Sequence, residues 1–179
     1  MIRKILKAPV AILGAGVSGK AVVQFCEEQG VAGTIFDASG TPFDSAVAPQ
    51  FATVVFSPAF PPNHPWLEIA RAAGCECLTE IDFAAQFLRE RELICVTGTN
   101  GKTTLTEFLA FALNRLGKNA VAVGNNGVPL TTQILKNCVP AEIIVCETSS
   151  FQAEPLEKMS PNAVLWTNID EDHLERHGS

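Results

Sequence analysis

The chain has 179 residues, of which 47% are apolar and 18% are charged, a composition typical of a globular protein with a substantial core. Its formal net charge of −6 argues against nucleic-acid and membrane partners, because both attract basic surfaces. No apolar run approaches the roughly 18 residues of a membrane span, and we expect no secretory signal. We therefore expect a cytoplasmic protein that holds any anionic ligand locally.

Six cysteines occur along the chain, and none of them forms a C-x-x-C pair. Most of them lie within apolar runs, which favours buried reduced thiols over disulfides or a metal site. This expectation also agrees with a cytoplasmic protein.

The first half alternates short runs rich in Val, Ile and Phe with longer helical patterns, as in a parallel α/β sheet covered on both faces. The pattern predicts strands at 9–13, 33–37, 53–57 and 75–78, and helices at 18–29, 65–73 and 83–89. The charged residues 89–92 then mark a boundary. We expect a Rossmann-like domain at 1–91 and a P-loop-type α/β domain at 92–179.

The second half begins the same alternation again. It predicts strands at 93–97, 119–123, 142–147 and 162–168, with helices at 103–116 and after the loop at 124–129. Residues 171–179 read as the first turns of a further helix, and no closing strand follows them. We therefore expect the second domain to be truncated.

The sequence "GTNGKTT" lies between a predicted strand and a predicted helix, where free backbone N–H groups and the helix dipole favour a phosphate. Gly98 and Gly101 permit a tight turn, Lys102 can reach phosphate oxygens, and Thr103 can bind Mg²⁺. The alternative is a plain turn with a surface lysine, but the combined pattern favours ATP. The predicted ATP-binding residues are Gly98, Thr99, Asn100, Gly101, Lys102, Thr103 and Thr104.

The sequence "GAGVSG" at 14–19 also follows a strand and opens a helix, and Asp37 ends the next predicted strand. Alone, this pattern is close to the fingerprint of NAD(P)-binding domains. The segment before residue 90 offers only about four strands, fewer than a dinucleotide-binding fold with two βαβαβ halves requires.

Four motifs in this order, "GTNGKTT", "GNNGVP", "ETSSFQAE" and "TNIDEDHLERHG", resemble the Mur ligase family of peptidoglycan synthesis, in which the short glycine loop is usual. The wording "SSFQ" and the glycine-rich opening are nearest to the branch that adds D-glutamate to UDP-N-acetylmuramoyl-L-alanine. The resemblance implies an ATP- and Mg²⁺-dependent ligase of cell-wall biogenesis, cell shape and cell division. ATP phosphorylates the substrate carboxylate, and an amine then attacks the acyl phosphate.

The resemblance also implies individual roles. Lys102, Glu147 and His173 become catalytic residues, and Thr103, Glu147 and His173 become ligands of metal ions. Glu147 could instead cap a helix or pair with Lys102, and a lone histidine among acids is more often a surface residue. His173 and His177 would share one helical face, as in a zinc site, but no third ligand is evident.

Six further residues are assigned to the sugar-nucleotide substrate by the same resemblance. Val17, Ser18 and Asp37 would hold the UDP portion, and Asn125, Ser149 and Gln152 would line the path of the muramoyl-alanine portion. Ser149 and Gln152 are also ordinary turn-forming residues, so both interpretations stay open. Arg176 would orient phosphate or carboxylate oxygens, or would lie on the surface.

The chain departs from the family pattern in several places. Ala59 stands where the family has a glycine, and Ser39 stands near the uracil contact. The family's carbamylated lysine and its C-terminal domain would follow Ser179, so we expect the 179 residues alone not to complete ligation. Two rival hypotheses remain: an NAD(P)-dependent oxidoreductase, and a module that binds ATP without turnover.

Overall fold

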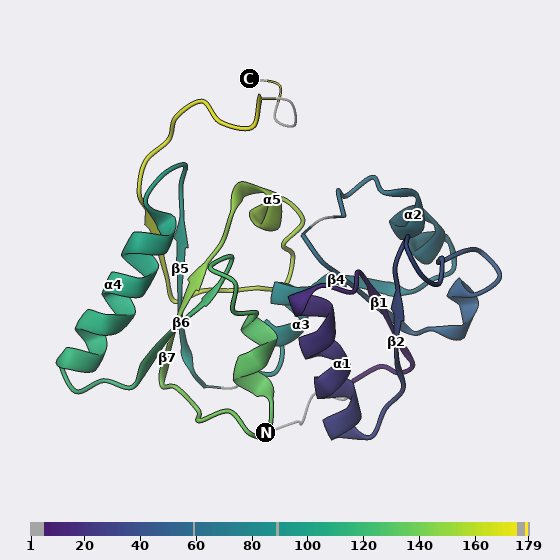
Figure 1. The fold of residues 1–179 in the computed structure, drawn as a ribbon, viewed down its shortest axis with the longest axis horizontal. Helices are drawn as coiled ribbons and strands as arrows, with labels where there is room; N and C mark the ends of the chain where they lie inside the picture. Colours follow the sequence, from purple (N-terminus) through teal and green to yellow (C-terminus); the bar gives the residue numbers. More distant parts are fainter. Residues whose placement is uncertain (1–5, 59, 89, 175–177, 179) are drawn as a thin grey trace.

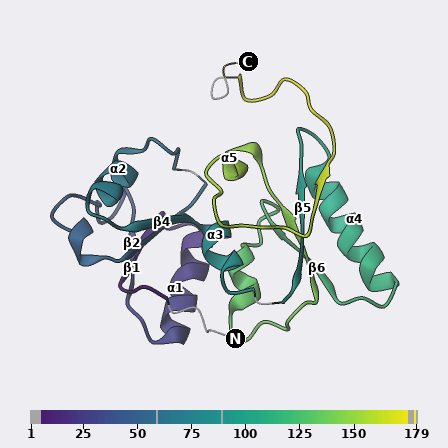
Figure 2. The ribbon, with the colours of Figure 1, turned by 180° about the vertical axis from the view of Figure 1, so that it is seen from behind.

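The computed structural model describes residues 6–58, 60–88, 90–174 and 178, which form two parallel four-stranded sheets (Figures 1 and 2). The first sheet has the order β2 (Gly33–Phe36), β1 (Val10–Leu13), β3 (Thr53–Phe56) and β4 (Glu76–Thr79). The second has the order β6 (Ala120–Gly124), β7 (Ile143–Glu147), β5 (Glu92–Thr97) and β8 (Ala163–Trp166). The predicted α/β class with two parallel sheets is confirmed.

The helices lie between the two sheets and on their outer sides. Figure 1 shows α4 beyond the second sheet and α2 at the opposite end of the molecule, with α1 and α3 between the sheets. The helices are α1 (Val17–Gln29), α2 (Pro65–Ala72), α3 (Glu80–Ala85), α4 (Lys102–Arg115) and α5 (Ser150–Ala153), and the 3₁₀ helices are η1 (Ala48–Gln50) and η2 (Leu130–Ile134).

Burial follows the position of each strand within its sheet. Every residue of β1, β3 and β7 is buried, as expected of central parallel strands covered on both faces. In contrast, β8 lies at the edge of its sheet, where the side chains of Val164 and Trp166 are 56% and 65% exposed. Among the described residues, no further strand pairs with β8 on its outer side.

Three predicted helices differ from the structure. The helix predicted at 83–89 begins at Glu80 because the Thr79 hydroxyl accepts a hydrogen bond from the Asp82 amide at 2.9 Å and caps it there. It ends at Ala85, and Arg89 lies outside the described residues. The second difference concerns the helix predicted to begin within 171–179. Residues 171–173 have no regular conformation, and 175–177 and 179 lie outside the described residues.

The helix predicted after the 124–129 loop is only the five-residue 3₁₀ helix η2. Three β-branched residues, Thr131, Thr132 and Ile134, lower its helix propensity. The Lys136 amide donates to the Glu28 carboxylate of α1 at 2.7 Å instead of extending the helix. Long-range contacts therefore decide the conformation of this segment.

Helix α3 follows the first sheet in sequence but packs in both cores. Its Phe83 joins β1 and α1 in one apolar cluster. Ile81, Ala84 and the following Leu88 join the cluster of the second sheet, which includes Val123 and Ile144. The division into domains at residues 91 and 92 stays a prediction, since α3 connects both halves.

All six cysteines are free thiols, as the sequence predicts. Four of them are buried: Cys26, Cys75, Cys95 and Cys146. Burial raises the pKa of the Cys26 thiol to about 11, which keeps it protonated at neutral pH.

The contact between the first glycine loop and α1 gives a stability prediction. A Cβ at Gly19 would overlap the backbone carbonyl oxygen of Gly14, which cannot move cheaply. Gly19→Ala is expected to lower the free energy of unfolding by about 1–3 kcal/mol, measured by urea denaturation. At the exposed Gly40 a Cβ meets only the Asp37 carbonyl oxygen at 4.0 Å, so Gly40→Ala serves as the control. Equal stability of the two variants would contradict this packing.

Candidate nucleotide site

The second glycine loop joins β5 to the first turn of α4 and depends on its two glycines. Gly98 has a φ of 128°, and a Cβ there would overlap Thr167 and Asn168. Gly101 has a φ of 81° and is the N-cap of α4, with no side-chain cap. The first amides of α4 are therefore available to an anion, as in other phosphate-binding helix starts.

Lys102 lies over this loop. Its Nζ donates to the carbonyl oxygens of Gly98 at 2.9 Å and Thr99 at 2.7 Å. The ammonium group is thus held at the loop by two neutral acceptors, rather than by Glu147, the alternative partner considered from the sequence. Phosphate oxygens carry charge and are stronger acceptors than carbonyl oxygens.

Glu147 ends β7, in register with Val96 of β5 on one side and Gly124 of β6 on the other. The residue is only 1% exposed. Its Oε1 accepts a hydrogen bond from Asn125 Nδ2 at 3.0 Å, whereas Oε2 is buried with no hydrogen-bond partner among the described residues. An unpaired buried carboxylate oxygen is costly, and a hard cation such as Mg²⁺ would satisfy it.

The segment after β8 braces the glycine loop. Asn168 Oδ1 accepts from the Asn100 amide at 2.9 Å, and Asn168 Nδ2 donates to the Asn100 carbonyl at 3.1 Å. The Asn168 carbonyl also accepts from the Thr99 amide at 3.1 Å. Sequence reasoning assigned no role to Asn168. Its position could have indicated a role, because Asn168 lies two residues beyond the end of β8, which pairs with β5.

A cavity of about 910 Å³ opens where β5, β7 and β8 end. Among its lining residues, six were predicted from the sequence: Gly98, Thr99, Lys102, Asn125, Ser149 and His173. The polar and aromatic lining residues that were not predicted are Thr97, Ser150, Phe151, Trp166, Asn168, Asp170, Glu171 and Asp172. Thr103 and Thr104 lie in the exposed first turn of α4, next to this cavity's Lys102.

His173 is one of the residues that line this cavity. It adopts a positive φ of 51°, its ring centroid is 4.7 Å from that of Phe151, and its Nε2 is 3.7 Å from the Asp172 carboxylate. Within the described part of the chain, no group of three or more His, Cys, Asp and Glu residues is arranged to hold a metal ion. The metal set of Thr103, Glu147 and His173 stays a prediction, and His177 and Arg176 lie outside the described residues.

Ser149 and Gln152 are hydrogen-bonded to each other. The Ser149 amide donates to Gln152 Oε1 at 2.9 Å, and the Gln152 amide donates to Ser149 Oγ at 3.3 Å. This reciprocal capping box begins α5. A structural role is thus observed for both residues, and their contact with substrate stays a prediction.

The first glycine loop lies at the corresponding end of the first sheet. The Asp37 carboxylate accepts from Ser39 Oγ at 2.7 Å, the Ser39 amide at 3.0 Å and the Ala15 amide at 3.2 Å. These bonds, chiefly the one from the Ser39 hydroxyl, hold the pKa of Asp37 below its ordinary value. Val17 and Ser18 follow in the first turn of α1, where Val17 is 65% exposed.

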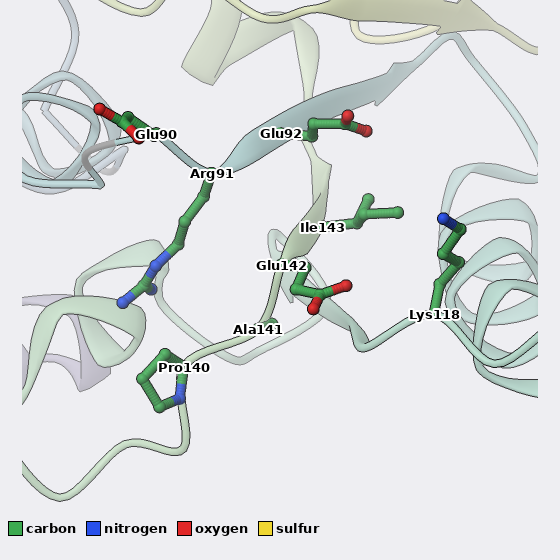
Figure 3. Close-up of a pocket in the computed structure, with 8 residues that line it drawn as sticks. All are labelled: Glu90, Arg91, Glu92, Lys118, Pro140, Ala141, Glu142 and Ile143. Carbon is green, nitrogen blue, oxygen red and sulfur yellow. The ribbon is translucent and has the colours of Figure 1, made fainter.

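A second cavity, of about 700 Å³, lies at the opposite end of the second sheet (Figure 3). Figure 3 shows Arg91 and Lys118 with three carboxylates, those of Glu90, Glu92 and Glu142. Parallel α/β sheets bind ligands at the carboxyl ends of their strands, and this cavity is at the amino ends. It contains none of the predicted site residues.

The second half has the features of a P-loop-type α/β protein. These are a parallel sheet, a glycine loop with a lysine at the helix start, and a buried carboxylate on the adjacent strand. Residues 96–179 match the Mur ligase middle domain. The chain is 33% identical to the UDP-N-acetylmuramoylalanine--D-glutamate ligase of Desulfatibacillum aliphaticivorans and 34% identical to that of Gloeobacter violaceus. These alignments cover 94% and 96% of this chain, and 41% and 43% of the relatives. The chain is thus similar to the Mur ligase family along nearly its whole length, and its second half matches the family's middle domain.

Solved structures show the same fold. The UDP-N-acetylmuramate-alanine ligase of Thermotoga maritima superposes with a TM-score of 0.55 at 23% identity, over 95% of this chain and 43% of that one. The UDP-N-acetylmuramate:L-alanyl-gamma-D-glutamyl-meso-diaminopimelate ligase of Neisseria meningitides gives 0.54 at 20% identity, over 92% and 61%. The chain spans about two fifths of the length of the curated relatives named above. In its described part, no helix has the length and apolar character needed to cross a membrane.

The hydrogen bonds around Asp37 give a prediction for its titration. Ser39→Ala removes the largest contribution to the lowered pKa, so the pKa of Asp37 is expected to rise toward its ordinary value. In the wild type, the stabilisation from these bonds is present above the ordinary pKa and is lost as pH falls through the lowered one. Carboxyl-carbon NMR titration of both proteins measures the shift. An identical pKa in the two would contradict the assigned role of Ser39.

Proposed function

We propose that this chain is the nucleotide-binding part of an ATP-dependent ligase that adds D-glutamate to UDP-N-acetylmuramoyl-L-alanine in peptidoglycan synthesis. The observation that carries the proposal is the buried Glu147 Oε2, which has no hydrogen-bond partner in the described part of the chain and lies on the strand beside the loop that holds Lys102. The relatives named as glutamate-adding ligases support the choice of amino acid. The location proposed for this activity is the cytoplasm.

In this proposal, residues 98–104 hold the phosphates of ATP through the amides of α4 and the Lys102 ammonium. Phosphoryl transfer depends mainly on positioning and on neutralising oxygen charge. Mg²⁺ fits the site because Glu147 offers an unpaired oxygen and Thr103 a hydroxyl. When bound, the ion would draw charge from the phosphate oxygens, and His173, which lines the cavity, would serve as a further metal ligand.

The sugar nucleotide would extend from the first sheet to this site. Val17, Ser18 and Asp37 would hold its UDP portion, with Asn125, Ser149 and Gln152 along the muramoyl-alanine portion. A small cavity between the two halves supports this path. It is lined by Phe56 and Thr79, at the ends of β3 and β4, and by Gln152 of α5. The carboxyl ends of both sheets thus converge on α5.

The proposed reaction has two steps. An oxygen of the alanine carboxylate attacks the γ-phosphorus of ATP, the bond to the β–γ bridging oxygen breaks, and ADP leaves. The amine of D-glutamate then attacks the acyl carbon, an amide bond forms, and inorganic phosphate leaves as the amine loses a proton. Because the chain spans two fifths of its relatives, we assign complete turnover to a polypeptide of the relatives' length.

Two other functions were considered. An NAD(P)-dependent oxidoreductase is suggested by Asp37 and the first glycine loop alone, but it leaves the Lys102 loop without a role. A module that binds ATP without turnover shares the nucleotide site and differs only in chemistry. Calorimetric titration with UDP-N-acetylmuramoyl-L-alanine is expected to show binding, and NADH none. The reverse result would favour the oxidoreductase.

The role of Lys102 is tested by its removal. Lys102→Ala is expected to weaken Mg·ATP binding by at least about tenfold, because charge-assisted bonds to phosphate contribute about 1.5–3 kcal/mol. Calorimetry measures the affinity. Lys118→Ala, at the opposite end of the second sheet (Figure 3), is the matched control and should leave it unchanged. An unchanged affinity in Lys102→Ala would remove the nucleotide assignment.

A further inference from the structure

Helix α3 belongs to the first half by sequence, yet its buried carboxylates are bonded to the second half. Asp82, 1% exposed, accepts from the backbone amide of Glu157 at 2.8 Å through Oδ2. Its Oδ1 accepts from the amides of Lys158 at 2.9 Å and Met159 at 2.8 Å. Hydrogen bonds to a charged acceptor are strong, so the segment 157–159 is firmly attached to α3.

Glu80 makes a second attachment from the same helix. It is 4% exposed, and its Oε1 accepts from both the amide and the hydroxyl of Thr131 at 2.6 Å. Thr131 is itself fully buried in η2. Burial raises the pKa of Glu80, and the two bonds from Thr131 oppose that rise.

These two attachments are made to segments that closely follow, along the chain, two groups next to Glu147. The segment at 157–159 follows α5 and its capping box of Ser149 and Gln152. Helix η2 follows the loop that carries Asn125, the residue hydrogen-bonded to Glu147 Oε1. One helix of the first half therefore holds both flanks of the buried carboxylate.

We propose that Asp82 and Glu80 are positioning residues, through which α3 places α5 and the Asn125 loop around Glu147 and so sets the affinity for the metal–nucleotide complex. This inference rests on the proposed function. The glycine loop with Lys102 joins β5 to α4. Among the described residues, Asp82 and Glu80 form no hydrogen bond with β5, with this loop or with α4. Binding of ATP without metal is therefore independent of the two attachments.

The test compares Asp82→Asn with the matched variant Asp44→Asn. The asparagine amide nitrogen cannot accept a hydrogen bond, so Asp82→Asn loses part of the attachment at 157–159. Asp44 also accepts from two backbone amides, those of Ala46 at 2.9 Å and Val47 at 3.0 Å, but in a loop of the first half. Circular dichroism first sets a temperature at which both variants are folded.

Asp82→Asn is expected to weaken Mg·ATP binding by about tenfold, the usual effect of losing support behind a metal ligand, while metal-free ATP binding stays within about twofold. By NMR, hydrogen exchange at the Ser149 amide should be faster. Asp44→Asn should change none of these quantities. Wild-type values of Ser149 exchange and Mg·ATP affinity in folded Asp82→Asn would overturn the inference.

Failure of the proposed function gives a different result. If the wild-type chain binds no Mg·ATP, that function fails, and Ser149 exchange alone decides whether Asp82 positions α5. If Asp82→Asn does not fold, Thr131→Val replaces it, since valine keeps the shape of threonine and removes one donor to Glu80. A shifted Asn125 side-chain resonance supports the inference in that case, and an unshifted one overturns it.

Discussion

The Glu147 carboxylate is buried at the end of β7 with one oxygen bonded to Asn125 and the other unpaired among the described residues. Leaving such an oxygen unsatisfied costs about 1–3 kcal/mol, and more when the group is charged. Such an unsatisfied group is common at functional sites, because a bound ligand that interacts with it offsets the lost stability. The strand that ends in this carboxylate is flanked by the strands that lead into the glycine loop and the Asn125 loop.

The strand order brings those parts together. Because β7 lies between β5 and β6, Glu147 ends beside the glycine loop on one side and the Asn125 loop on the other. Because β8 pairs with β5, Asn168 in the segment after β8 reaches Asn100 and braces the loop. Parallel strands direct all these segments to one edge of the sheet, where open α/β folds bind ligands.

Local patterns were sufficient to predict the strands and the place of each glycine loop between a strand and a helix, because each depends on neighbours in sequence. The roles of Lys102 and Glu147 stay predictions. Asn168 and the pair of Asp82 and Glu80 were missed because their partners lie 51 to 77 positions away and are found only once the sheet order is known. The short η2 was missed for the same reason. Ser149 and Gln152 carried a readable capping signature, S-x-x-Q, but the sequence left a turn-forming role and a substrate contact equally open for both residues.

The most direct test is a crystal structure of the chain with Mg²⁺ and a non-hydrolysable ATP analogue. The account predicts Mg²⁺ coordinated by Glu147 Oε2, with the triphosphate against residues 98–104 and Lys102 Nζ moved from the loop carbonyls to phosphate oxygens. A nucleotide bound elsewhere, or a Glu147 Oε2 that stays unpaired while the nucleotide occupies the loop, would contradict it.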